Sequence, residues 1–203
     1  MSSALLNTAY FPPVEYFRQC YKHNHVFIEA NEHYQKQSYR NRCTIAGPNG
    51  LQNLVVPVIK GRSPGQPIRD VRIDYSEPWQ GNHRRSIETA YAAAPFFEFY
   101  YEDIYPFFKQ KPRFLFDLNL SIIEKLIALF DLDTRIFMTQ KYTSPAKNGI
   151  ADLRDKIHPK KQSIVVQQPY IQVFSERHGF QPGLSALDLL FNEGPAGKAY
   201  LSG

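Results

Sequence analysis

Residues 47–50 have the sequence Gly-Pro-Asn-Gly, a combination found mainly in tight turns. Apolar runs stand on both sides of it, RNRCTIAG at 40–47 and LQNLVVPVIK at 51–60. Two such runs around a turn of this kind predict a β-hairpin, in which residues 40–47 are extended. Pro57 cannot donate a backbone hydrogen bond, so we expect the second strand to lie at a sheet edge or to contain a bulge.

The spacing of apolar residues elsewhere predicts both helices and strands. Residues 118–132 carry leucine and isoleucine at helical spacing and form the clearest amphipathic helix of the chain. Other segments predicted to be regular are helices at 14–22, 83–94, 96–105 and 184–194, strands at 25–30, 68–75 and 134–142, and an extended run at 163–174. We therefore expect a mixed α/β fold. It is a single compact domain over residues 1–203, with a small β-sheet or hairpin near the N-terminal half and several helices packed on it. The polar stretch at about 143–163 is predicted to be a mobile loop with one helical turn at 151–157.

The composition is that of a folded protein, because 43% of the 203 residues are hydrophobic and can bury a core. The net charge of +5 is compatible with an anionic small-molecule partner, but without a lysine-rich tail we expect no nucleic-acid binding. Two cysteines, Cys20 and Cys43, are too few for a disulfide framework. The N-terminus does not resemble a secretory signal, and no apolar run approaches the ~20 residues that cross a bilayer. We expect a cytoplasmic protein without a membrane span.

A group of cations precedes the predicted turn, with no acid in residues 34–43. If this segment is a strand, Lys36, Arg40 and Arg42 share one face. An arginine guanidinium matches a carboxylate or phosphate with two parallel hydrogen bonds, so the row predicts an anion site, with Asn41 orienting a neighbouring group. In the alternative interpretation the row is a solvated strand face. Its cations then pair with acids of the protein, namely Glu29, Glu32 or Asp70.

His83 opens the predicted helix at 83–94, with Trp79 four residues before it and Asn82 as a candidate N-cap. The positive end of a helix dipole favours a neutral imidazole, which is the form able to accept a proton. His83 is therefore a candidate general base. The alternative interpretation is a histidine that caps or packs the helix beside Trp79.

Other chemistry has little support in the sequence. His23, His25 and His33 lie close in the chain, but zinc needs three or four converging ligands and the spacing fits no known signature, so no metal site is predicted. Cys20 has no neighbour that would lower the pKa of its thiol, which favours a buried apolar role. The aromatic run at 96–101 is interpreted as core.

Several segments together resemble the WbqC-like protein family. They are YFPPVEYFRQC at 10–20, VFIEANEHYQKQSYRNRCTI at 26–45, LVVPV at 54–58, the spacing W-x-x-x-H-x-x-x-I-x-x-x-Y at 79–91, and YIQVFSERHGFQPGLSALDLLFNEG at 170–194. The resemblance extends from about Ala9 to Gly194. The chain departs from the pattern where many members have glutamine, at Thr8 or Ala9. It departs again where many have paired acids, at Glu29, Ala30 and Asn31.

Some members of this family are encoded with genes for surface polysaccharide or O-antigen assembly. The resemblance therefore implies a bacterial transferase that modifies an activated sugar, with a small anionic or sugar-containing substrate and no identified cofactor. In this hypothesis His83 accepts the acceptor's proton and Glu29 fixes its tautomer. The candidate substrate-binding residues are Tyr16, Lys36, Arg40, Asn41, Arg42 and Trp79. The alternative hypothesis is a non-catalytic binding module for an anionic metabolite or a protein partner, and the oligomeric state is open in both.

Overall fold

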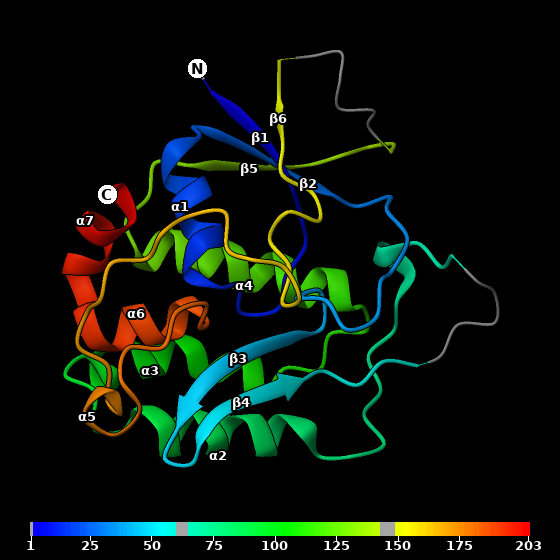
Figure 1. The fold of residues 1–203 in the computed structure, drawn as a ribbon. Helices are drawn as coiled ribbons and strands as arrows, with labels where there is room; N and C mark the ends of the chain where they lie inside the picture. Colours follow the sequence, from blue (N-terminus) through cyan, green and yellow to red (C-terminus); the bar gives the residue numbers. More distant parts are fainter. Residues whose placement is uncertain (1, 60–64, 143–148) are drawn as a thin grey trace.

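The computed structural model describes residues 2–59, 65–142 and 149–203. It shows a single compact domain of mixed α/β class, as predicted (Figure 1). Its main sheet has four parallel strands in the order β5-β2-β1-β6. Their bounds are β1 Ser3–Asn7, β2 His25–Glu29, β5 Arg135–Met138 and β6 Ala151–Asp152. Because every pair is parallel, all four strands end at the same edge of the sheet.

Helix α1 (Val14–Lys22) connects β1 to β2 and lies below the sheet in the view of Figure 1. Its Phe17 ring lies 5.6 Å from the ring of Phe130, which follows α4 (Leu115–Leu129). Pro13 precedes α1, where its missing N–H costs nothing, and residues Val14 to Cys20 are buried. The predicted helix at 14–22 and strand at 25–30 are confirmed. Strand β1 was not predicted from the sequence. It pairs with β2 in a parallel register that places Leu5 beside Phe27.

The β-hairpin around residues 47–50 is confirmed as β3 (Arg42–Gly47) and β4 (Gly50–Val55), in antiparallel register. Strand β3 begins at Arg42 and not at residue 40 as predicted, because residues 36–41 form turns and Gln37 has a φ of 57°. The single strand face for Lys36, Arg40 and Arg42 is therefore wrong. Arg40 turns inward and is buried, whereas Lys36 is exposed.

The other helices are α2 (Trp79–Tyr91), α3 (Phe97–Ile104), α5 (Ser175–His178), α6 (Ala186–Glu193) and α7 (Gly197–Ser202). Short 3-10 turns occur at Ile68–Asp70, Tyr105–Phe108 and Gly194–Ala196. Two predictions are wrong here. Helix α2 begins at Trp79, so Asn82 is not its N-cap, and the predicted strand at 68–75 is a 3-10 turn followed by isolated bridges. None of the described helices has the length and apolar character needed to cross a bilayer.

The core lies between the helices and the two sheets. The aromatic run after α2 belongs to it, as expected, through Phe97, Tyr100 and Phe107. Both cysteines are buried and free, and burial raises the pKa of each thiol well above its ordinary value. Neither cysteine is therefore suited to act as a nucleophile.

A buried carboxyl group holds the extended segment after residue 163 against α6. Asp188 accepts hydrogen bonds from the Tyr170 hydroxyl at 3.2 Å and from Gln172 Nε2 at 3.1 Å. No basic side chain in the described part of the chain forms an ion pair with it. Burial raises the pKa of Asp188 to about 7.

Candidate functional site

The order in which strands are added to the parallel sheet reverses at β1. Strand β2 pairs with one side of β1, and β6, which comes much later in the chain, pairs with the other side. In sheets of this kind ligands bind outside the carboxyl ends of the strands, at such a switch point. Asn7 ends β1, Glu29 ends β2 and Asp152 ends β6. These three side chains therefore lie where a sheet of this topology binds ligands.

A pocket of about 490 Å³ opens at this edge of the sheet. We call it the carboxyl-edge pocket. Its lining residues are Asn31, Glu32, His33, Gln35, Tyr142, Arg154 and Asp155. They come from the segment after β2, from the segment after β5 and from the turn after β6, so the sheet brings together parts of the chain that are about 120 residues apart.

Glu32, Arg40 and Asp155 are linked by ion pairs at the wall of the pocket. Arg40 Nε donates to Glu32 Oε1 at 3.0 Å, and Arg40 Nη2 donates to Glu32 Oε2 and, at 2.9 Å, to Asp155 Oδ1. The side chains of Glu32 and Arg40 are 7% and 3% exposed, whereas that of Asp155 is 40% exposed. Glu32 thus holds Arg40, and Arg40 holds a carboxylate that a ligand can reach.

The side chain of Asn7 connects Glu32 with Asp155. Its Nδ2 donates to Glu32 Oε2 at 2.5 Å, and its Oδ1 accepts from the backbone N–H of Asp155 at 2.6 Å. The amide is therefore used on both sides, and it ties the end of β1 to the turn after β6. Tyr16 supports this end of β1, since its hydroxyl donates to the Asn7 carbonyl at 3.0 Å.

Arg154 forms the second fixed cation of the site. It donates to both oxygens of Asp152, at 3.0 and 3.1 Å, and to Glu29 Oε2 at 3.0 Å. Its guanidinium carbon lies 4.7 Å from the centre of the Tyr142 ring. The side chain is 7% exposed, so this cation is mostly a buried strut between β2 and β6.

The orientation of Asn31 is determined by its neighbours. Its Nδ2 donates to the carbonyl oxygen of Thr139 at 2.9 Å, and a carbonyl can only accept. The Thr139 hydroxyl in turn donates to Glu29 Oε1 at 2.6 Å. The amide oxygen of Asn31 is therefore the group left to face other partners.

Burial and ion pairing act in opposite directions on the acids of the site. Burial raises the pKa of Glu32, although Arg40 and Asn7 partly offset it. Asp152 is also affected by burial, but its hydrogen bonds with Arg154 outweigh it, so the pKa of Asp152 lies below its usual value. Within the described residues, no group of three or more His, Cys, Asp or Glu side chains is arranged to hold a metal ion.

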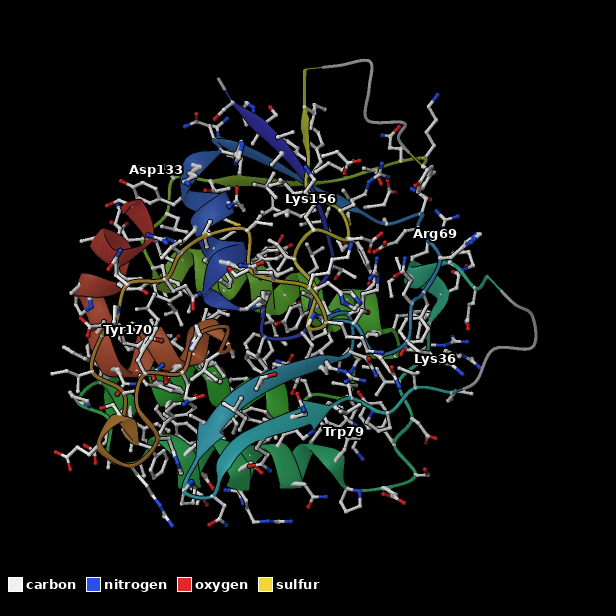
Figure 2. All side chains as sticks on the ribbon, in the orientation of Figure 1. Lys36, Arg69, Trp79, Asp133, Lys156 and Tyr170 are labelled. Carbon is white, nitrogen blue, oxygen red and sulfur yellow. The ribbon has the colours of Figure 1, made fainter. Side chains whose placement is uncertain are left out.

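The structure brings only part of the predicted site together. Arg40 and Glu29 lie at the carboxyl edge, but both are paired with charges of the protein. Arg40 pairs with Glu32, one of the acids named in the alternative interpretation, whereas Glu29 pairs with Arg154, which lies outside the cationic row. Asn41 is buried and donates from Nδ2 to the Val56 carbonyl at 2.9 Å. Arg42 is half-buried at the start of β3. Lys36 is exposed and Trp79 is buried, and neither lines the carboxyl-edge pocket; both are labelled in Figure 2.

His83 is not among the residues of the carboxyl-edge pocket. It is buried in an aromatic cluster, with Nδ1 2.9 Å from the Tyr10 hydroxyl and the Trp79 ring centre 5.1 Å away. Burial lowers the pKa of His83 to about 4, with a smaller opposing effect from a hydrogen bond to the Val55 backbone. Its catalytic role stays a prediction, and the geometry matches a packing histidine.

Sequence reasoning missed Asn7, Asp152, Arg154 and Asp155, and it considered Glu32 only as an ion-pair partner. Asp152, Arg154 and Asp155 lie in a stretch that was predicted to be a mobile loop. Part of that loop, 143–148, lies outside the described residues. The remainder is not a helical turn at 151–157 but the short strand β6 followed by turns. The one available signal was the alternation of acid and base in Ala-Asp-Leu-Arg-Asp at 151–155.

The family model of the WbqC-like protein family matches residues 8–161, more than half of the chain. The chain belongs to the WbqC-like protein family. The match includes every charged residue of the carboxyl-edge pocket and its ion pairs, from Glu29 to Asp155. A relative of this WbqC-like protein is "Uncharacterized protein Rv1507c" of Mycobacterium tuberculosis (strain ATCC 25618 / H37Rv). It is 27% identical, over 98% of this chain and 96% of the relative. No solved structure matches this WbqC-like protein.

Proposed function

We propose that this WbqC-like protein is a transferase that modifies the sugar part of an activated sugar, and that the reaction takes place in the carboxyl-edge pocket. One observation carries the proposal. Asp155 presents a partly exposed carboxylate to a pocket of about 490 Å³, while Arg40 holds it from behind at 2.9 Å. The location at a switch point of a parallel sheet supports the same pocket.

Transfer of a group to an acceptor atom requires that the acceptor lose a proton as the new bond forms. A carboxylate placed within hydrogen-bond reach of that proton can accept it, and such general-base catalysis contributes about 10²–10⁴-fold in rate. Arg40 and Glu32 fix the position of Asp155, so little reorganisation is needed when the acceptor binds. In this proposal Asp155 takes the role that the sequence had suggested for His83.

The remaining lining suits a polyhydroxylated ring. The side-chain amide oxygens of Asn31 and Gln35 can accept hydrogen bonds from hydroxyl groups, and Tyr142 offers an aromatic surface that is 61% exposed. The context of surface polysaccharide or O-antigen biosynthesis rests on the family resemblance alone. That the substrate is an activated sugar rests on the same ground.

The test begins with a thermal-shift screen of nucleotide-sugars and candidate group donors against the purified protein, since a ligand that binds only the folded state raises the melting temperature. Compounds that bind are then incubated in pairs, and products are identified by mass spectrometry. Turnover should fall by about 100-fold or more in Asp155→Asn. Asp103→Asn is the matched control, because Asp103 is 41% exposed and paired with Lys125 at 3.1 Å outside the pocket.

Each result decides between the two hypotheses. Turnover that depends on Asp155 and not on Asp103 supports the transferase. Equal turnover in Asp155→Asn and wild type would show that Asp155 is not the general base, and the proposed mechanism would be refuted. Tight binding of an anionic metabolite with no turnover in any donor and acceptor pair would favour the non-catalytic binding module.

A further inference from the structure

The amide and guanidinium groups that line the carboxyl-edge pocket already donate to the protein, which leaves the Tyr142 hydroxyl and the His33 ring as the lining donors that can reach a ligand. Asn31 Nδ2 donates to the Thr139 carbonyl, and the three guanidinium nitrogens of Arg154 donate to Asp152 and Glu29. Gln35 Nε2 lies 3.4 Å from Asp155 Oδ2, a long contact that also points its donor toward the protein. A ligand that needs donors from this wall finds few available.

Acceptors, in contrast, remain open in the same pocket. Asn31 Oδ1 has no hydrogen-bond partner within residues 2–59, 65–142 and 149–203, and its direction follows from the Thr139 carbonyl on the other side of the amide. Among the residues that the structure describes, Asp155 Oδ2 receives only the long contact from Gln35. The pocket therefore presents a carboxylate oxygen and an amide oxygen to its contents, which favours a ligand group with several donors and no acceptor.

The charge of the open carboxylate oxygen favours a cation among such groups. Asp155 is the acid that a ligand can reach, because its side chain is 40% exposed whereas that of Glu32 is 7% exposed. Arg40 donates to Oδ1 of Asp155 at 2.9 Å, and Lys161 Nζ donates to its backbone carbonyl oxygen at 2.6 Å. Oδ2 therefore offers a negatively charged acceptor in a partly buried site, where charges are less screened than in water.

We infer that the acceptor bound in this pocket is a primary amine, held by Asp155 Oδ2 and Asn31 Oδ1 as its ammonium form, so that the substrate class is an amino sugar. The inference rests on the proposed function for the sugar part, but the recognition of the amine stands on the pocket alone. A protonated amine offers three donors and no acceptor, the complement of what the wall leaves open. Transfer would then begin when Asp155 takes one proton from the ammonium group, which frees the electron pair of the nitrogen. That pair forms the new bond to the transferred group, the bond between this group and the rest of the donor breaks, and the leaving group departs with the electron pair of the broken bond. The nitrogen then releases a second proton, which the leaving group or water takes up.

The experiment compares matched ligands by isothermal titration calorimetry. The probes are glucosamine, galactosamine and mannosamine, each with its N-acetyl derivative and its parent hexose, together with cyclohexylamine, cyclohexanol and inorganic phosphate. At least one amine should bind ten times more tightly than both its uncharged counterparts. Asp155→Asn should lose that preference at least tenfold, Asp155→Glu should restore part of it, and Asp103→Asn should leave it unchanged. Circular dichroism and thermal unfolding establish that the variants are folded.

The outcomes separate the inference from the proposed function. If amines bind no better than their hydroxyl counterparts while a hexose derivative is turned over, the transferase stands and the amine inference is wrong. If an amine is preferred through Asp155 but no donor gives turnover, the inference stands and the transferase fails. Phosphate that binds more tightly than every amine, or amine binding that Asp155→Asn does not change, would overturn the inference.

Discussion

The buried pair of Glu32 and Arg40 gives the sharpest test of how the site is held together. Their side chains are 7% and 3% exposed and share two hydrogen bonds, so little solvent screens them. Removing one partner of a buried ion pair typically costs about 3–5 kcal/mol, because the other charge is left uncompensated. Arg40→Met keeps most of the side-chain volume and leaves Glu32 without its cation. We expect the free energy of unfolding to fall by about that amount.

The assay is urea unfolding followed by circular dichroism. With a slope of about 2 kcal/mol per M, the loss corresponds to a midpoint lower by roughly 1.5–2.5 M. The double variant Glu32→Leu/Arg40→Met should regain at least half of the loss, because an apolar pair replaces two charges that cost much to bury. Arg84→Met is the control. Its partner is the more exposed Glu88, and its midpoint should match that of wild type. A shift below about 0.5 M in Arg40→Met would refute the reasoning.

Three further measurements test the rest of the fold. Asp188 has its pKa raised to about 7, so the folded state keeps a proton that the unfolded state releases near pH 4, and the stability this provides is lost as the pH rises. Between pH 5 and 7 the free energy of unfolding of wild type should therefore fall by about 2 kcal/mol relative to that of Asp188→Asn. The pKa shift of His83 changes stability with pH in the opposite direction. Burial lowers its pKa to about 4, so on acidification from pH 6.5 to 4 wild type should lose about 3 kcal/mol relative to His83→Gln. Urea midpoints of wild type and each variant, measured at each pH, check both differences. Gly194 has a φ of +52°, and an added Cβ would lie 2.6 Å from the Phe96 ring, whereas Gly183, with a φ of +75°, has no atom within 4 Å. Gly194→Ala should therefore lower the melting temperature more than Gly183→Ala, which loses roughly 1–2 kcal/mol, and equal melting temperatures would contradict the Phe96 contact.

The parts of the fold that depend on local patterns were predictable. The Gly-Pro-Asn-Gly turn predicts the β3–β4 hairpin, and helical spacing predicts α4, because in both cases neighbours in sequence decide the structure. The segment from Lys36 to Asn41 was not predictable in this way. Its conformation follows from the burial of Arg40 against Glu32 and Asp155, and Asp155 lies 115 residues further along the chain.

The candidate site was harder to predict for the same reason. Strand β6 has two residues, too few to show any alternation, so Asp152 and Arg154 looked like parts of a polar loop. His83 attracted a catalytic interpretation because the helix was expected to begin next to it. Helix α2 begins four residues earlier, at Trp79, which turns the imidazole into the aromatic cluster around Tyr10.

The lateness of β6 in the chain has a consequence for synthesis on the ribosome. By the time Arg40 has emerged, β1, β2 and Glu32 are present and the first ion pair can form. Asp155, the partly exposed acid of the carboxyl-edge pocket, follows 115 residues after Arg40. A nascent chain therefore carries an incomplete crevice until its last quarter is made, and closing a segment of this length costs entropy that only the finished contacts repay. Ligand recognition would then report that translation has passed residue 155, and prematurely terminated products would be inert toward the substrate.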